Sequence, residues 1–466
     1  MSDGSGTERP SSEELHREVE ELRRQNEQLH RENEQLRQQI AELEQKLAEL
    51  ERTGLRQAAP FRRPPHHHKA SAQRPGRKPG HPGSFRRTPS HVDETIRVPL
   101  EHCPQCGGPV SRLRDVEQFI EEIPPIRVHV SRLITQRGRC PRCGWVRSTH
   151  PMQMSLSSGC AKVQLAPRAL ALAAELKYRL GLSYRKACHL LRQFGLSVTP
   201  GGLVQALARV ARKLSPLYQQ IAGAIRAGPA VYADETSWWV GGPSWWLWVF
   251  ATPRETFYWV DCTRGSAVVE QILGERFGGV LVSDCLTSYD PIQCTKHKCY
   301  AHHLKALSEA IATTPASQAE PLTQLRLLLI GAKALQAVRK DVPAEQFAQY
   351  SQNLRANAER LLAQSYPSLG VEKALHRFRT HREHLFTFFE HPEVDPTNNL
   401  AERQLRPAVI ARKLSCGNKT QAGRDSWQIL SSIAATCSQR THSFLDLLTA
   451  ATPLLSPAPL LATLKG

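Results

Sequence analysis

Two aspartates stand where they could hold metal ions together. Asp234 lies in the middle of a strand-like run, 230–240, and Asp284 ends a short apolar run that begins at Gly279. An isolated carboxylate in a buried strand is costly, and two facing carboxylates repel unless a cation lies between them. Carboxylate oxygens suit Mg²⁺ or Mn²⁺, which also bind phosphate oxygens. The alternative is that each aspartate caps a turn or pairs with an arginine.

A third carboxylate, Glu402, lies far along the chain in a polar run that ends at Pro407. Thr397 or Asn398 can cap a helix here, which places Glu402 in its early turns. Pro407 is expected to kink or end that helix. A carboxylate with nearby cations suits a site that holds metal and grips a phosphodiester, whereas the alternative is a surface helix with a plain Glu–Arg pair. The nearby cations are Arg403, Arg406, Arg412 and Lys413.

The elements that must position the two aspartates follow the order β-β-β-α-β. This is the order of a ribonuclease-H-like fold, in which the first and fourth strands lie side by side, so Asp234 and Asp284 would face each other. Residues 301–394 read as mostly helical and are interpreted as an insertion before the Glu402 helix. The expected elements are strands at 230–240, 244–251 and 256–260, a helix at 266–276 and a strand at 279–284.

Four of the twelve cysteines form two Cys-Pro-x-Cys-Gly knuckles. Two knuckles give four soft ligands, which suit a closed, tetrahedral and therefore structural Zn²⁺ site. The 33 residues between the knuckles contain strand-like stretches at 116–123 and 126–135, which indicate a ribbon hairpin. Redox-active or free thiols are the alternative. The predicted zinc ligands are Cys103, Cys106, Cys140 and Cys143.

Leucines recur every seven residues from Leu15 to Leu50 near the start of the chain. This heptad spacing predicts a parallel two-stranded coiled coil over 13–51. Residues 52–100 then contain 11 Lys/Arg, two acids and eight prolines, which is typical of an extended linker. Arg74, Arg77 and Lys78 could lie along a DNA minor groove, or the segment could be a generic basic tether.

Residues 160–228 are helical by pattern and contain a candidate helix-turn-helix. Ser183 can cap a first helix to about Phe194, and Thr199-Pro200 can start a second helix through about Leu214. Helical hairpins are common, so DNA readout here is one interpretation of two. The polar groups that could reach DNA are Tyr184, Arg185, Lys186, Gln205 and Arg209.

Taken together, these motifs resemble those of transposases of the insertion-sequence-66 family. The motifs, in the family's order, are the N-terminal zipper, Gly-Arg-Lys-Pro-Gly-His-Pro-Gly at 76–83, the cysteine knuckles, Tyr-Ala-Asp-Glu-Thr at 232–236, Ser-Asp-x-x-x-x-Tyr at 283–289 and Asn-Asn-x-Ala-Glu-Arg-x-x-Arg-Pro at 398–407. The resemblance implies that Asp234, Asp284 and Glu402 are a DDE triad. It also implies a helical insertion between the second and third acids, and accessory proteins encoded by the same element.

Two further segments bear on the resemblance to this family. Residues 414–420 differ from the Asn-Trp form that many family members have, which puts the local DNA contacts in doubt. Cys299-Tyr-Ala-His302 resembles a family Cys-x-Ala-His element, so His302 could lie near the metals or be a satisfied core histidine.

The expected activity is DNA transposition by two-metal phosphoryl transfer with Mg²⁺ or Mn²⁺. Water would cut at the element's ends, and the freed 3′-OH would attack target DNA, with the carboxylates as ligands and not nucleophiles. One rival is a non-catalytic zipper and zinc-finger DNA-binding regulator, and another is a nuclease without strand transfer. The net charge of +18 favours a nucleic-acid partner in either case.

The sequence therefore predicts a multidomain α+β protein that forms a homodimer or larger assembly through its coiled coil. No membrane span or secretory signal is expected, so we expect a cytoplasmic, nucleoid-associated protein. The predicted parts are a disordered start (1–12), a zipper (13–51), a basic linker (52–100), a zinc-ribbon-like module (101–150), a helical DNA-binding region (160–228), a ribonuclease-H-like core in two pieces (229–300 and 395–440) around a helical insertion (301–394), and a C-terminal tail (441–466).

Overall fold

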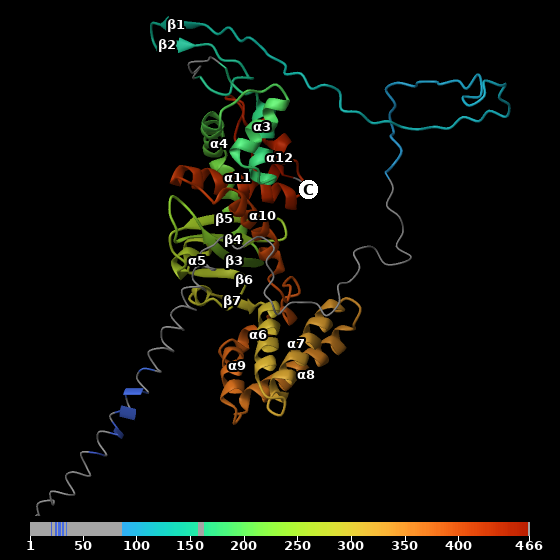
Figure 1. The fold of residues 1–466 in the computed structure, drawn as a ribbon. Coiled ribbons are helices and arrows are strands. Elements are labelled where there is room, and N and C mark those ends of the chain that lie inside the picture. The colour runs from blue at the N-terminus through green and yellow to red at the C-terminus, as the bar shows by residue number, and fades with distance from the viewer. Residues whose placement is uncertain are drawn as a thin grey trace, which may run out of the picture. The chain divides into compact units, whose positions relative to one another are not determined.

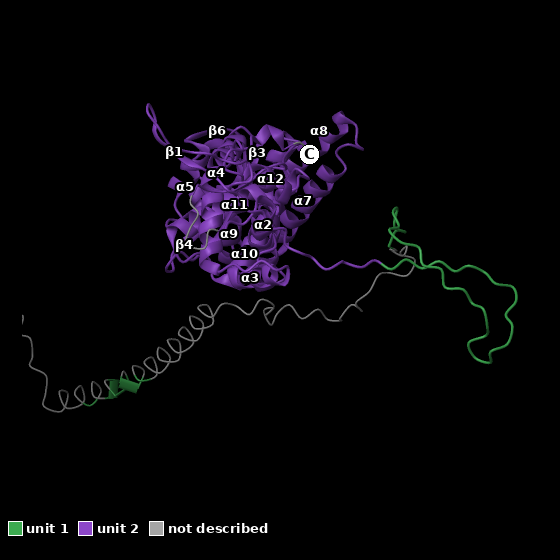
Figure 2. Ribbon diagram, turned by 90° about the horizontal axis from the view of Figure 1, so that it is seen from above, with its two compact units in different colours: residues 1–120 green, residues 121–466 purple. Residues whose placement is uncertain are grey.

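The computed structural model describes residues 86–156 and 163–464, together with isolated helical positions between 20 and 34. The chain divides into two units, Met1–Ile120 and Glu121–Gly466 (Figure 2). Apart from those isolated positions, the predicted zipper lies outside the described residues. The predicted disordered start and the basic positions Arg74, Arg77 and Lys78 lie outside them as well.

The described part of the first unit is a mostly irregular and exposed chain with one tight turn. Within this turn the Cys103 carbonyl accepts a hydrogen bond from Gly107 N (2.8 Å), and Cys103 N donates to the Gly108 carbonyl (2.9 Å). Gly107 has a φ of +74°, a conformation that favours glycine. The sequence of the first knuckle therefore determines its local shape.

The second unit contains the other knuckle, on a short antiparallel hairpin near its start. Its strands are β1 (Arg137–Cys140) and β2 (Gly144–Arg147). The strands predicted at 116–123 and 126–135 were wrong, because these residues are exposed and contain no strand. Their alternating pattern has no face to pack on, and an isolated two-stranded ribbon is only marginally stable in water.

Three helices and a π-helical turn form the region before the sheet. As predicted, Ser183 Oγ accepts a hydrogen bond from Lys186 N (3.3 Å) and Thr199 Oγ1 accepts one from Gly202 N (3.1 Å). The second helix does not end near Leu214 but continues to Arg226, because its apolar face continues and packs on the sheet. The elements are α2 (Pro167–Ala174), the turn at Glu175–Arg179, α3 (Tyr184–Gln193) and α4 (Pro200–Arg226).

A mixed five-stranded sheet, in the order β5-β4-β3-β6-β7, forms the centre of the second unit (Figure 1). The first three strands along the chain are antiparallel neighbours, whereas β6 and β7 run parallel to β3. The predicted pairing of the first strand with the fourth is therefore observed. The strands are β3 (Ala230–Trp238), β4 (Trp245–Ala251), β5 (Thr256–Asp261), β6 (Arg276–Ser283) and β7 (Gln293–Lys298), with α5 (Ser266–Leu273) between β5 and β6.

Two helices from the end of the chain pack against this sheet. Helix α10 (Asn399–Ser415) contacts β3 and β4, and α11 (Gln421–Gln439) contacts β5 and α4. Pro407 was expected to kink or end its helix, but α10 continues past it for two more turns. Tertiary packing of Ala401, Leu405 and Ala408, all buried, offsets the cost of the proline.

Helix α11 also binds the backbone of the edge strand β5. Gln428 Oε1, Ser432 Oγ and Thr436 Oγ1 accept hydrogen bonds of 2.9–3.1 Å from backbone N–H groups of β5. Four helical residues rise about 6 Å, which nearly matches the ~7 Å spanned by two strand residues. One face of the helix can therefore satisfy every second N–H of the strand, namely those of Val260, Tyr258 and Thr256.

A helical insertion separates β7 from α10, as predicted, and lies beyond the β7 edge of the sheet (Figure 1). Its return segment covers that edge, because Thr387 Oγ1 donates to the Lys296 carbonyl of β7 (2.6 Å). The insertion consists of α6 (Tyr300–Thr313), α7 (Glu320–Ala337), α8 (Ala344–Ala363), α9 (Leu369–Thr380) and short turns to Phe389.

Among the described residues, no helix is both long and apolar enough to span a membrane.

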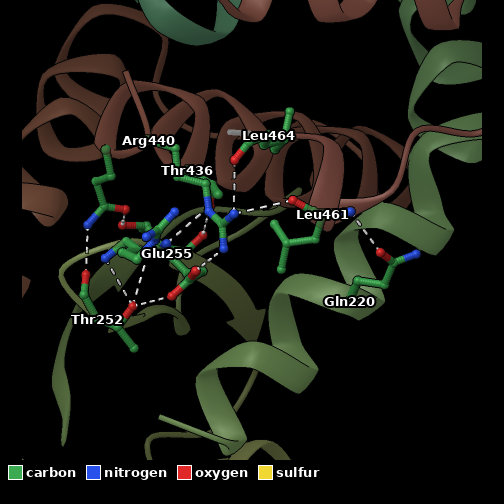
Figure 3. Close-up of polar contacts among 10 residues, drawn as sticks. Gln220, Thr252, Glu255, Thr436, Arg440, Leu461 and Leu464 are labelled. Atoms are coloured by element: carbon green, nitrogen blue, oxygen red, sulfur yellow. Dashed lines mark hydrogen bonds and ion pairs between the residues drawn. The ribbon is translucent and has the colours of Figure 1, made fainter. Parts of the chain in front are cut away.

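The C-terminal segment, predicted to be a tail, is folded onto the second unit up to Leu464. Helix α12 (Phe444–Ala451) packs against α2 and α11. Arg440 pairs with the buried Glu255 and donates to the carbonyls of Leu461 (3.2 Å) and Leu464 (3.0 Å) (Figure 3). One guanidinium thus connects the β4–β5 turn, the end of α11 and the last described residues.

Candidate active site

Asp234 and Asp284 occupy equivalent positions on neighbouring parallel strands. The last register pair of β3 and β6 is Tyr232 with Val282, and each aspartate lies two residues further along its own strand. Asp284 directly follows β6, where its Oδ1 accepts a hydrogen bond from Leu286 N (2.9 Å). Parallel register therefore brings the two acids close to the point where the pairing of β3 with β6 ends.

Asn398 connects three of the segments that position the acids. Its Nδ2 donates to the carbonyl of Ala233, the residue before Asp234 (2.8 Å), and its own carbonyl accepts a hydrogen bond from Glu402 N (3.2 Å). Its backbone N–H donates to Cys299 Sγ (3.1 Å). Asn398 is the N-cap residue of α10, but its side chain is used for this strand contact and not for the cap predicted from the sequence.

Cys299 completes the connection to Asp284. Its backbone N–H donates to the carbonyl of Ser283, which immediately precedes Asp284 (2.9 Å). Through Asn398 and Cys299, a short chain of hydrogen bonds thus joins the backbone next to Asp234, Asp284 and Glu402. The sequence predicted Asn398 as a possible helix cap and placed Cys299 in a family motif, but it did not predict this linking role.

The electrostatics of Asp234 also place the three acids near one another. Burial is the main cause that raises the pKa of Asp234 to about 7, followed by the negative charge of Glu235. The charges of Asp284 and Glu402 contribute smaller parts of this rise, and a hydrogen bond from Glu235 N acts in the opposite direction. A buried carboxyl among other acids gains stability from a bound cation, so this donor set fits a hard divalent metal ion.

Glu235, the next residue on β3, has hydrogen-bond and ion-pair partners of its own. Its buried carboxylate accepts hydrogen bonds from Arg264 (2.6 Å) and from the Tyr289 hydroxyl (2.6 Å), and Arg264 also stacks on Trp246. Successive strand residues point to opposite faces, so Glu235 points away from Asp234. Sequence reasoning did not single out Glu235, although Tyr289 belongs to the motif that follows Asp284.

Glu402 also has two neighbours that are not carboxylates. The ligand atoms of Cys299, His302 and Glu402 all lie within 4.8 Å of one another. Among the described residues, this is the most compact group of three or more potential metal ligands. Asp234, Asp284 and Glu402 do not form a group as tight as this. His302 thus lies beside the third acid, the first of the two positions considered for it from the sequence.

The cations predicted around Glu402 do not all have the same surroundings. Arg403, Arg406 and Lys413 are exposed on α10. The guanidinium of Arg412 instead donates to Thr236 Oγ1 (3.1 Å) and Ser237 Oγ (2.8 Å) of β3, and burial lowers its pKa. Arg412 therefore fastens α10 to the strand of Asp234, and a DNA contact from it stays a prediction.

The segment after Lys413 is fixed to the end of β3. Asn418 Oδ1 accepts a hydrogen bond from Trp238 Nε1 (2.8 Å), and Asn418 N donates to the Trp239 carbonyl (2.9 Å). Gly417 has a φ of +91°, and a Cβ there would lie 2.5 Å from the Trp239 carbonyl oxygen. The departure from the family pattern noted at 414–420 thus coincides with a structural contact.

The other predicted site residues lie elsewhere. Arg185 and Lys186 are exposed at the start of α3, and Gln205 and Arg209 are exposed on α4, so all four can be reached from solvent. Tyr184 is instead half-buried, with Lys177 over its ring. Their contact with DNA stays a prediction.

Each cysteine knuckle is preformed by its own backbone. Hydrogen bonds from the backbone of Gln105 and Cys106 lower the pKa of the Cys103 thiol, and those of Cys143 and Arg142 lower that of Cys140. A lowered thiol pKa favours the thiolate that Zn²⁺ binds. The two knuckles belong to different units, so the four-cysteine zinc site stays a prediction.

The chain is similar to known proteins over most of its length. Three uncharacterized proteins of Sinorhizobium fredii (strain NBRC 101917 / NGR234) are similar to the chain: y4qI (25% identical, covering 81% of this chain and 75% of the relative), y4jD (23%, 74% and 73%) and y4hP (22%, 78% and 71%). The model of the family described as "Transposase IS66 family" matches residues 162–426, which is more than half of the chain and includes all three acids. The chain therefore belongs to the IS66 family of transposases.

Proposed function

We propose that the chain is a DNA transposase that binds the ends of an insertion sequence and catalyses metal-dependent strand cleavage and strand transfer. Asp234, Asp284 and Glu402 would be its DDE residues, in a ribonuclease-H-like core interrupted by the helical insertion. The observation that supports this most directly is the matched register of Asp234 and Asp284, combined with the effect of the Glu402 charge on the pKa of Asp234.

The three carboxylates would hold two Mg²⁺ or Mn²⁺ ions. When bound, such ions supply a lowered pKa for the attacking water or 3′-hydroxyl and neutralise charge on the phosphodiester. Asp234 must give up its proton to act as a ligand, which a nearby dication makes favourable. Asn398 and Cys299 join the backbone next to Asp234 and Asp284 to the start of the Glu402 helix, which would keep the three segments in a constant arrangement when metal binds.

The DNA would lie along the exposed cations of α10, beside Glu402. Arg403, Arg406 and Lys413 can contact phosphates there, while Arg412 keeps the helix on the strand of Asp234. The basic residues of the linker and of α3 would add contacts to the element ends. The zipper would pair two chains, and the cysteine knuckles would bind a structural Zn²⁺, so each of these parts has a role in an assembly on DNA.

The test is cleavage and joining of labelled element ends by the full-length chain with Mg²⁺ or Mn²⁺, in the presence of the element's accessory proteins. We expect wild type and the exposed-loop variant Asp341→Asn to cut and join, and Asp234→Asn to do neither. Intact activity of Asp234→Asn would refute the triad. Cleavage without joining would favour a nuclease, and binding without cleavage would favour a non-catalytic regulator.

A further inference from the structure

A compact group of three unlike ligands lies at the edge of the proposed active site. Cys299, His302 and Glu402 each offer one ligand atom, and these atoms lie within 4.8 Å of one another. Ligand atoms around a tetrahedral zinc ion are about 3.5 Å apart, given bonds of about 2.0–2.3 Å. Small side-chain movements would therefore close the group around one ion.

The two helices that contribute these ligands begin at the same place. Cys299 is the N-cap residue of α6 and His302 follows three residues later, while Glu402 is in the first turn of α10. The hydrogen bond from Asn398 N to Cys299 Sγ joins the two helix starts. The ligands are therefore fixed by the fold and not carried on a loose loop.

His302 does not behave as a satisfied core histidine. Its Nδ1 is buried and has no hydrogen-bond partner among the described residues. A buried ring nitrogen without a partner is costly unless something else binds it. A metal ion that the cluster binds through Nδ1 would satisfy this nitrogen.

The chemistry of the three donors differs from that of the triad. A thiolate, an imidazole and a carboxylate favour a borderline cation such as Zn²⁺, whereas three carboxylates favour Mg²⁺ or Mn²⁺. Three protein ligands also leave a fourth position for water. Glu402 belongs to both sets, so one ion in the mixed site competes with the triad for the same carboxylate.

We propose that Cys299, His302 and Glu402 form a Zn²⁺ site that shares Glu402 with the metal-binding triad and inhibits the transposase when filled. On binding, the Cys299 thiol proton passes to solvent, and no other bond is made or broken than those to the ion. The binding part is independent of the activity assigned to the chain, but the inhibitory part rests on the proposed function.

Binding is tested first, on the full-length chain equilibrated with micromolar free Zn²⁺ and with Co²⁺ as a spectroscopic substitute. Wild type should bind one more Zn²⁺ per chain than Cys299→Ser or His302→Gln. Cys299→Ser should lose part of the near-ultraviolet thiolate-to-cobalt absorption, whereas the exposed-cysteine variant Cys262→Ser should match wild type in zinc content. Equal zinc content in wild type, Cys299→Ser and His302→Gln would overturn the proposal. If Cys299→Ser does not fold, His302→Gln alone decides, because it keeps the thiol.

Inhibition is tested next, by titrating Zn²⁺ into the cleavage reaction at fixed Mg²⁺. His302→Gln should need at least ~10-fold more Zn²⁺ for half inhibition than wild type or Cys262→Ser, since losing even an outer partner of a metal site costs about 10–100-fold. Equal sensitivity would overturn the inhibitory role. If Asp234→Asn also cleaves, the triad is refuted, while the zinc content still decides whether the site exists.

Discussion

Replacing Asp234 with asparagine should stabilise the metal-free protein, and increasingly so as the pH rises. Asp234 has a pKa raised from 3.8 to about 7 in the folded chain. Below pH 3.8 the carboxyl is protonated in both states, so it has no pH-dependent effect. Between 3.8 and about 7 the unfolded chain loses the proton while the folded chain retains it, so folding stability falls as the pH rises. Asparagine removes this titration.

The magnitude follows from that pKa. Each pH unit in the window corresponds to about 1.4 kcal/mol, so the advantage of Asp234→Asn should grow by about 3 kcal/mol from pH 5 to pH 8. The unit Glu121–Gly466 has an unfolding entropy of roughly 0.7 kcal/mol/K at about 2.1 cal/mol/K per residue. The difference in Tm between variant and wild type should therefore increase by about 4 °C.

Thermal unfolding in chelator at pH 5, 6, 7 and 8 measures this difference, and Asp341→Asn provides the matched exposed aspartate. The change with pH is the informative quantity, because any pH-independent effect of the amide cancels. A difference in Tm that stays constant or shrinks toward pH 8 would refute the assignment of Asp234 as a buried acid among other acids. Added Mn²⁺ at pH 8 should raise the Tm of wild type more than that of Asp234→Asn.

Three further substitutions test how the site is supported. Asn398→Ala should lower the cleavage rate about 100-fold, because misplacement of reacting groups by ~1 Å can have an effect of this size. Circular dichroism should show near-normal folding, and a near wild-type cleavage rate would contradict the linking role of Asn398. Gly417→Ala should lower the free energy of unfolding in urea by at least ~2 kcal/mol, because of backbone strain and a clash with the backbone. Gly242 has open space around it, so Gly242→Ala should lower this free energy clearly less. Arg440→Met should cost about 3–5 kcal/mol by leaving Glu255 buried without its partner, and should expose the C-terminal segment to protease; unchanged proteolysis would argue against that anchor.

The strand order and the positions of the two aspartates could be predicted because buried strands have recognisable apolar runs in the sequence. Strands β3 to β6 are rich in apolar and aromatic residues, so their existence follows from pattern, and β7 was missed because it reads Gln-Cys-Thr-Lys-His-Lys. Its buried polar groups are satisfied by partners that only the folded chain provides: Lys298 pairs with Asp290 (3.0 Å), and His297 lies between the carbonyl oxygens of His384 and Pro396, 87 and 99 residues away. No local pattern contains that information.

The positions of the site residues in space were harder to predict than their chemical roles. Glu402 could be identified only from its motif, because 117 residues separate it from Asp284 and nothing in the spacing brings them together. The contact of Arg412 with β3 and the cluster around Cys299 depend on how α10 and α6 pack on the sheet. The prediction of a helix end at Pro407 was wrong for the same reason, since tertiary packing outweighed the local tendency of proline to end a helix.

The two edges of the sheet have a consequence for how this protein can assemble. The side chains of α11 occupy the backbone donors of β5, and the segment returning from the insertion covers β7. A strand from another molecule cannot add to β5 without displacing α11, which protects the protein against edge-to-edge aggregation. Any assembly of several chains would therefore have to form through side-chain surfaces or other segments of the chain, and not by adding strands to this sheet.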